Sequence, residues 1–151
     1  MKTNEMNHKS VEEKLNNVLA DLQVIYQNFR TMHWLVKGPD FYMLHKMYEG
    51  FYNETAEVVD EVAERILTLE GLPLHHFSDY LEHATVKSVT VVPAGKESLK
   101  IATENFSHLL NAYRDILALA SKQSDEGTVA LMSEFIASTE KKLWMLKSTL
   151  A

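Results

Sequence analysis

Apolar residues recur at helical spacing in four long stretches of this sequence, so each stretch is predicted to form an amphipathic α-helix. The first helix is predicted to begin at the Ser10–Glu13 capping box and to end at Gly38-Pro39. Asp40 is a suitable N-cap for a second helix that runs to Glu70, with Gly71 as its C-terminal cap. The buried positions predicted in these two helices are Leu15, Val18, Leu19, Leu22, Ile25, Phe29, Met32 and Val36, then Leu44, Tyr48, Phe51, Val58, Val62, Ile66 and Leu69.

The C-terminal half is predicted to hold two more helices, over about residues 95–121 and, after a turn at 124–127, to about Leu150. The connection over residues 71–94 has no such period. Within it, FSDYLEHA favours a short helix capped by Ser78, and the lone β-branched run at 86–92 is interpreted as an extended segment. The buried positions predicted in the two helices are Leu99, Ala102, Phe106, Leu109, Tyr113, Ile116 and Ala120, then Met132, Phe135, Ile136, Thr139, Leu143, Leu146 and Leu150.

These elements predict an all-α fold, a four-helix bundle with a long crossover connection that carries a short extra helix. A chain of 151 residues is expected to form one domain, over residues 10–151, behind a flexible N-terminal tail at 1–9. The tail has no apolar core of a secretory signal, and no uncharged apolar run is long enough for a membrane span. The sequence has no cysteine, which excludes disulfides, thiolate metal sites and cysteine nucleophiles.

Two pairs of potential metal ligands lie on the second predicted helix. His45 and Glu49 are four residues apart, and so are Asp60 and Glu64, so each pair shares a helix face beside the apolar stripe. His33 lies at the edge of the buried stripe of the first helix. Imidazole together with carboxylate suits divalent iron, manganese or zinc.

The two pairs cannot meet within one unbroken helix. Glu49 and Asp60 are about 16 Å apart at the rise of an α-helix, whereas two bridged metal ions are about 3.5–4 Å apart. A second copy of the helix that runs antiparallel would bring the pairs together, and small residues at Ala56 and Ala63 would let it approach closely. The hypothesis is therefore an oxidative iron site shared between two subunits.

Each residue also has a plainer interpretation. A single histidine such as His33 at the edge of a core stripe is more often a hydrogen-bonded structural residue. His45 with Glu49 could be a surface pair, and Asp60 with Glu64 a solvated acidic face. Their joint placement on one arc of one helix favours the metal site over these alternatives.

At these positions the sequence resembles the mini-ferritins, the family called Dps (DNA-binding protein from starved cells). The similarity extends over residues 10–150. Its motifs are RTMHW at 30–34, DFYMLH at 40–45, EVVDEVAERI at 57–66, EGLP at 70–73, DEGT at 125–128 and KKLWML at 141–146.

The resemblance implies a dodecamer of ferritin-like bundles, built from two-fold dimers, around a cavity that stores ferric iron. It implies that the protein is an enzyme, a ferroxidase that oxidises Fe²⁺ with hydrogen peroxide or O₂ at inter-subunit sites and so protects against oxidative stress. The implied ligands of the dinuclear iron site are His33, His45, Glu49, Asp60 and Glu64. Zn²⁺ and Mn²⁺ are expected surrogates for iron at this site.

Several positions bear on further details of the resemblance. Trp34 matches a family tryptophan beside the site, and Glu49 stands where Asp is usual. Acidic residues near the start of the fourth helix are implied to line an iron-entry pore. The candidates here are Asp125, Glu126 and Glu134, while Ala130 stands where many relatives have Asp.

The net charge of −6 and a tail with only two lysines predict weak or absent DNA binding. The expected location is the cytoplasm, with nucleoid association as a variant of it. The main alternative is a nucleoid-associated structural protein that acts by binding DNA. A surface-interaction protein that keeps the shell without the chemistry is a third hypothesis.

Overall fold

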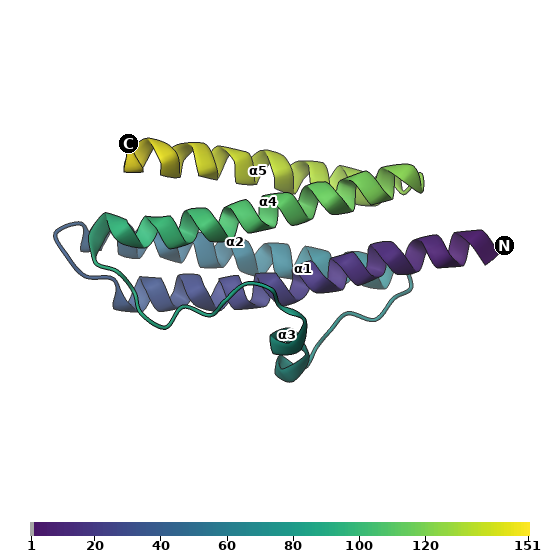
Figure 1. Ribbon diagram of the computed structural model, residues 1–151, viewed down its shortest axis with the longest axis horizontal. Coiled ribbons are helices and arrows are strands. Elements are labelled where there is room, and N and C mark those ends of the chain that lie inside the picture. Colours follow the sequence, from purple (N-terminus) through teal and green to yellow (C-terminus); the bar gives the residue numbers. More distant parts are fainter. Residues whose placement is uncertain (1) are drawn as a thin grey trace.

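The structure is a computed structural model that describes residues 2–151, with side chains described from residue 11 onward. Four long helices run along one axis, and α3 lies to the side of them on the connection (Figure 1). No strand occurs between residues 2 and 151, which confirms the predicted all-α class. The elements are α1 (Lys2–Leu35), α2 (Phe41–Thr68), α3 (Phe77–His83), a 3₁₀ turn η1 (Gly95–Glu97), α4 (Ser98–Lys122) and α5 (Glu126–Leu150).

The helices pack as two antiparallel pairs, α1 with α2 and α4 with α5, and α1 also contacts α4. Because α2 and α4 run in the same direction, the chain must return along the whole bundle between them (Figure 1). The predicted crossover connection, with its short helix, is therefore confirmed. None of the helices that the structure describes is both long and apolar enough to cross a membrane.

Polar side chains on α1 hold the crossover connection against the bundle through hydrogen bonds. The Asn16 amide donates to a backbone carbonyl and accepts from a backbone N–H within residues 72–74, at 3.2 and 2.9 Å. Asn28 does the same within residues 87–89, at 3.0 and 2.8 Å. These bonds supply partners for the backbone of a segment that belongs to no helix or sheet.

Asp21, one of the few buried charged residues, is the third of these anchors. Its Oδ1 accepts from the backbone N–H groups of Thr85 at 2.6 Å and Val86 at 3.1 Å. Its Oδ2 accepts from the Thr85 hydroxyl at 3.0 Å and from Nε2 of His108 at 2.8 Å. One carboxylate thereby joins α1, the crossover and α4.

Replacing Asp21 with alanine is expected to lower the free energy of unfolding by about 1–3 kcal/mol, because two part-buried N–H groups lose their acceptor. Asp21→Asn keeps an acceptor oxygen and should cost less. Urea unfolding gives the size of the loss, and faster hydrogen exchange at the amides of Thr85 and Val86 would locate it. Equal losses in the two variants would show that charge, rather than hydrogen-bond acceptance, holds the crossover.

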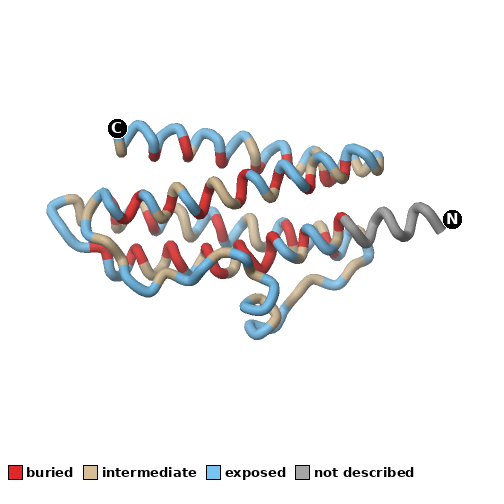
Figure 2. Tube along the Cα trace, viewed as in Figure 1, coloured by how far each residue is buried: buried red, intermediate tan, exposed pale blue. Residues whose placement is uncertain are grey.

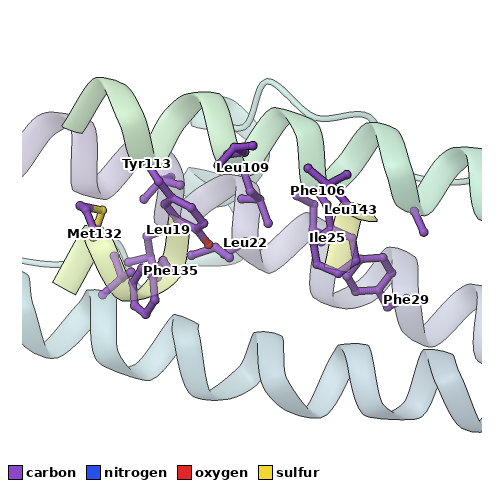
Figure 3. Close-up of a cluster of buried hydrophobic side chains, with 14 of the residues drawn as sticks. Leu19, Leu22, Ile25, Phe29, Phe106, Leu109, Tyr113, Met132, Phe135 and Leu143 are labelled. Atoms are coloured by element: carbon purple, nitrogen blue, oxygen red, sulfur yellow. The ribbon is translucent and has the colours of Figure 1, made fainter. Parts of the chain in front are cut away.

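The core lies between the helices along the length of the bundle (Figure 2). Figure 3 shows Phe29, Phe106 and Leu143 at one end of a buried cluster and Tyr113, Phe135 and Met132 at the other. Every predicted inward position of α1 and α4 is buried. On α2 and α5 some positions are only half-buried because they lie at the edge of the contact between helices: Phe51, Val58, Leu69, Ile136 and Leu150.

Two predicted helix starts differ from the structure. Helix α1 begins at Lys2 rather than Ser10. Ser10 lies inside this helix, so the predicted capping box is not at its N-terminus. The flexibility predicted for residues 1–9 stays a prediction. Helix α3 begins at Phe77, with His76 rather than Ser78 at the N-cap. Asp40 does occupy the N-cap of α2, but its side chain makes no capping hydrogen bond.

The end of α2 is also different from the prediction. The left-handed residue is Glu70, with φ of 66°, rather than Gly71. Gly71 N–H bonds to the carbonyl of Ile66 and Glu70 N–H to that of Leu67, both at 2.9 Å, which is a Schellman motif. A Cβ at position 71 would lie 2.4 Å from the carboxyl carbon of Glu12, so a larger residue there would require the Glu12 side chain to move.

Candidate metal centre

His33 and His45 face each other across the antiparallel contact between the end of α1 and the start of α2. Their rings stack with 3.7 Å between centroids and 14° between planes. The Nδ1 of His33 lies 2.6 Å from the carbonyl oxygen of His45, and the Nδ1 of His45 lies 2.7 Å from the carbonyl oxygen of His33. The two residues therefore orient each other through a reciprocal pair of hydrogen bonds.

These bonds determine which ring nitrogen carries the proton. A carbonyl oxygen only accepts, so Nδ1–H must be the donor in both rings, and in the neutral imidazole the lone pair is then on Nε2. A second hydrogen bond of this kind is typical of histidines that bind metals. The two residues are thus structural histidines through Nδ1 while Nε2 remains a potential metal ligand.

Aromatic rings surround the histidine pair. Phe41 stacks on His45 with 4.9 Å between centroids, and the Tyr52 ring meets the His33 ring edge-on at 5.3 Å. The Tyr52 hydroxyl donates a long hydrogen bond of 3.5 Å to Oε1 of Glu49. Desolvation, and after it the charge of Glu49, raises the pKa of the Tyr52 phenol, which therefore stays protonated at neutral pH as a donor to that carboxylate.

The predicted carboxylate ligands are all exposed on α2. Glu49 lies one turn beyond His45, while Asp60 and Glu64 lie near the other end of the helix. Within the described residues no three His, Asp or Glu side chains come close enough together to hold a metal ion. The chain brings together His33 and His45, with Glu49 one helical turn further along α2, and it leaves Asp60 and Glu64 as a separate group.

Asp60 and Glu64 lie on a surface that carries several other carboxylates. Burial raises the pKa of Glu61, and four nearby carboxylates raise it further: Glu134 of α5 first, then Glu57, Asp60 and Glu64. Like charges at this density disfavour one another, and a bound cation would relieve that repulsion. This face is therefore suited to a cation, although it lacks a histidine of its own chain.

The predicted pore residues divide into two kinds. Glu126 and Glu134 are exposed on α5. Asp125 instead caps that helix, and its side chain is only 6% exposed. It accepts from the Arg65 guanidinium at 2.8 Å and from the backbone N–H of Thr128 at 3.2 Å. This carboxylate is engaged in holding α2 against α5, so the pore stays a prediction that rests on the other two residues.

Burial alone would raise the pKa of Asp125, but hydrogen bonds from Thr128 and the charge of Arg65 outweigh it and lower the pKa. A lowered native pKa means that the carboxylate stabilises the fold above the ordinary pKa of Asp, about 3.9, and that this contribution is lost as the pH falls below it.

Asp125→Asn keeps a capping oxygen and removes the charge. We expect it to lower the free energy of unfolding by about 1–3 kcal/mol at neutral pH, with the difference from wild type shrinking below about pH 4. Urea unfolding at a series of pH values measures this. A difference that stays constant down to pH 3 would contradict the assigned role of the charge.

Sequence reasoning missed Tyr52 and Phe41. Tyr52 is three residues after Glu49 and seven after His45, so helical spacing would have placed it on the same face. Phe41 carries no chemical signal, and its stacking on His45 depends on how the loop at 36–40 presents the start of α2.

Comparison with known proteins agrees with the fold. A family model for the ferritin-like domain matches residues 12–151. A crystal structure of the Dps protein from Vibrio cholerae O1, described as a member of a broad superfamily of ferritin-like diiron-carboxylate proteins, aligns with a TM-score of 0.94 and 43% identity, covering 97% of this chain and 92% of that one. The DNA protection during starvation protein of Porphyromonas gingivalis is 41% identical over 138 residues, which is 91% of this chain and 87% of the relative.

A structure of Dps from Listeria innocua soaked with zinc aligns with a TM-score of 0.90 and 30% identity, covering 93% of this chain and 95% of that one. The relatives are similar over nearly the full length of the chain rather than over a fragment. The chain therefore belongs to the ferritin-like family and, within it, to the Dps proteins.

Proposed function

We propose that this protein is an iron-sequestering mini-ferritin that oxidises Fe²⁺ at sites shared between two copies of the chain. The observation that carries the proposal is the reciprocal pairing of His33 and His45, which leaves Nε2 of both rings as a ligand. Neutral imidazole and carboxylate are ligands that suit divalent iron. The family membership supports the same chemistry.

The site is proposed to form between two antiparallel α2 helices related by a two-fold axis. His33, His45 and Glu49 of one subunit would face Asp60 and Glu64 of the partner subunit, and the same contact would repeat on the other side. Such a contact would place the cationic metal ions in the negative field around Glu61. The two carboxylates, free of any ion pair that the described residues offer, would supply hard oxygen ligands that favour Fe³⁺ over Fe²⁺.

Iron is the substrate of the reaction. Two Fe²⁺ ions at one site would each give up one electron, and one hydrogen peroxide would accept both electrons and one proton from solvent and be reduced to water and hydroxide. Two-electron reduction avoids release of a hydroxyl radical. The ferric product would be stored inside a dodecameric shell, which would account for protection against oxidative stress in the cytoplasm. Zn²⁺ and Mn²⁺ are the expected surrogates at the same ligands.

The test is anaerobic oxidation of Fe²⁺ by hydrogen peroxide, with Fe²⁺ supplied at two per site. We expect rapid oxidation that consumes one peroxide for every two Fe²⁺, little hydroxyl-radical spin adduct, and strong inhibition when Zn²⁺ is bound first. A parallel experiment with O₂ in place of peroxide ranks the two oxidants. Oxidation no faster than that of Fe²⁺ in buffer, or unaffected by Zn²⁺, would reject the ferroxidase assignment.

DNA compaction remains the alternative function, and charge argues against it. The chain carries a net charge of −6, and an assembly of several chains would carry a correspondingly larger negative charge. This charge opposes binding to DNA phosphates. In a gel shift with linear duplex DNA at about 0.1 M salt, where the Debye length is about 10 Å, we expect no complex at sub-micromolar protein. A complex under those conditions would favour the nucleoid-binding alternative.

A further inference from the structure

Arg65 is an isolated cationic side chain beside the acidic residues of α2. It is the only lysine or arginine between Lys46 and Lys87, and it directly follows a proposed metal ligand, Glu64. An arginine on a helix commonly pairs with a carboxylate one turn away, and Glu61 stands four residues before it. Arg65 does not form that pair, because its guanidinium is engaged by α5 instead.

The first turn of α5 holds the guanidinium. Figure 1 shows the end of α2 and the start of α5 at the same end of the bundle. Arg65 donates from Nη2 to Oδ1 of Asp125 at 2.8 Å and from Nε to the Thr128 hydroxyl at 2.9 Å. The Thr128 hydroxyl in turn donates to Oδ2 of Asp125 at 2.6 Å. The Arg65 side chain is only 20% exposed.

The same turn also leaves space for the guanidinium. A Cβ at Gly127 would lie 2.6 Å from Nη2 of Arg65 and 2.8 Å from Nη1, so a larger residue there would require the guanidinium to move. Asp125 supplies the opposite charge, and Thr128 supplies an acceptor that is itself oriented by Asp125. The first turn of α5 thus matches one guanidinium in charge, space and hydrogen bonding.

The placement of Arg65 affects the charge that a metal ion would meet at Asp60 and Glu64. Neither carboxylate is in an ion pair with the described residues. While Asp125 balances its charge, the guanidinium adds no net charge to this surface. A released guanidinium would lie among the carboxylates of α2 and would compete with a cation for them. At a protein surface, a unit charge several ångströms from a divalent ion changes the affinity for that ion by roughly tenfold.

We propose that the first turn of α5 keeps the metal affinity of Asp60 and Glu64 high by withholding the Arg65 guanidinium from them. This inference rests on the proposed ferroxidase function, and it makes Asp125 a positioning residue that touches no metal ion. The plainer role of the Arg65–Asp125 pair is to tie α2 to α5. Removing the arginine separates the two roles, since a tie between helices is lost equally from either side.

The experiment measures Zn²⁺ binding to assembled shells by calorimetry, because Zn²⁺ occupies the site without being oxidised. Asp125→Asn frees the guanidinium and is expected to raise the dissociation constant about tenfold. Arg65→Gln breaks the same ion pair but leaves no cation behind, so its dissociation constant should equal that of wild type or be lower. The double variant should return to the wild-type value, although urea unfolding should show all three variants destabilised.

Two further measurements separate charge from structure. Raising the salt from about 0.1 M to about 1 M shortens the Debye length from about 10 Å to about 3 Å, so the binding defect of Asp125→Asn should shrink. In peroxide-driven oxidation this variant should show a higher KM for Fe²⁺ with kcat unchanged, because the ligands themselves are intact.

Glu54→Gln is the matched control. Glu54 also joins α2 to α5, through an ion pair of 2.8 Å with Lys142, but the cation that its loss would free belongs to α5. This variant should bind Zn²⁺ as wild type does. A loss equal to that of Asp125→Asn would show that any broken tie between the two helices weakens the site, and it would overturn the inference.

Arg65→Gln or double-variant shells that bind Zn²⁺ as weakly as Asp125→Asn would also overturn the inference, and so would Asp125→Asn shells that bind as tightly as wild type. Should Asp125→Asn fail to assemble, Arg65→Gln decides: binding at least as tight as wild type supports the inference, and weaker binding contradicts it. Each of these results leaves the proposed function standing. Wild-type shells that bind no Zn²⁺ would instead reject the proposed site itself, and the inference with it.

Discussion

Replacing Asp60 with alanine is expected to slow peroxide-driven Fe²⁺ oxidation by at least about 100-fold, while the shell still assembles. The loss is large because the partner's histidines would then face a single carboxylate and could not hold two ions. The fold should be unaffected, because Asp60 is exposed on α2 and its side chain makes no hydrogen bond or ion pair with the described residues. Stopped-flow absorbance of ferric product gives the rate, and native mass gives the assembly.

Glu57→Ala is the matched control. Glu57 is an exposed carboxylate one turn earlier on the same helix and belongs to the same negative surface around Glu61, but it is not a proposed ligand. A comparable loss in both variants would mean that surface charge, rather than coordination by Asp60, governs the rate. An Asp60→Ala protein that oxidises iron as fast as wild type would remove Asp60 from the site.

Phe29→Ala should have the largest effect on stability, lowering the free energy of unfolding by about 3–5 kcal/mol. Phe29 is fully buried, and Figure 3 shows it near Phe106. Its ring centroid lies 5.1 Å from that of Phe106 and 5.4 Å from that of Phe51. Truncation would leave a cavity where α1, α2 and α4 meet, one turn before His33. At about 2–4 °C per kcal/mol for a chain of this size, the melting temperature should fall by roughly 6–20 °C.

Gln27→Ala, at an exposed position two residues earlier, should change stability by no more than about 0.5 kcal/mol. Wild type and both variants must be compared at one protein concentration, because assembly stabilises the folded chain by mass action. A Phe29→Ala protein within about 1 kcal/mol of wild type would show that the bundle collapses around the missing ring.

The arrangement of the fold could be predicted from the sequence because the spacing of apolar residues and most signals for helix ends depend only on residues that are close together in the sequence. The positions predicted to face inward on α1 and α4 are all buried, and Asp125 caps α5 as its turn signal indicated. The wrong predictions are at helix ends where residues distant in the sequence lie close in space. Glu70 adopts the left-handed conformation, and the following Gly71 lies against the Glu12 side chain, which is 59 positions away in the sequence.

The sequence predicts which residues make up the candidate metal centre, and this ligand set stays a prediction; the geometry of the histidine pair could not be predicted. Spacing places His45 and Glu49 on one face, and it requires Asp60 and Glu64 to belong to another site or another subunit. The reciprocal hydrogen bonds of His33 and His45 involve backbone carbonyls across a loop, which no side-chain pattern reveals. The contact of Tyr52 with His33 depends in the same way on how α1 and α2 cross.

The most direct measurement of the shared site is complementation between two inactive chains. One chain carries His33→Ala with His45→Ala, and the other carries Asp60→Ala with Glu64→Ala. Co-expressed in equal amounts, they should form mixed dimers in which one of the two sites keeps both halves. If subunits mix at random, about a quarter of the wild-type peroxide-driven oxidation should return, whereas separately expressed chains mixed after assembly should stay inactive. No recovery in co-assembled shells that contain both chains would contradict a site shared between subunits.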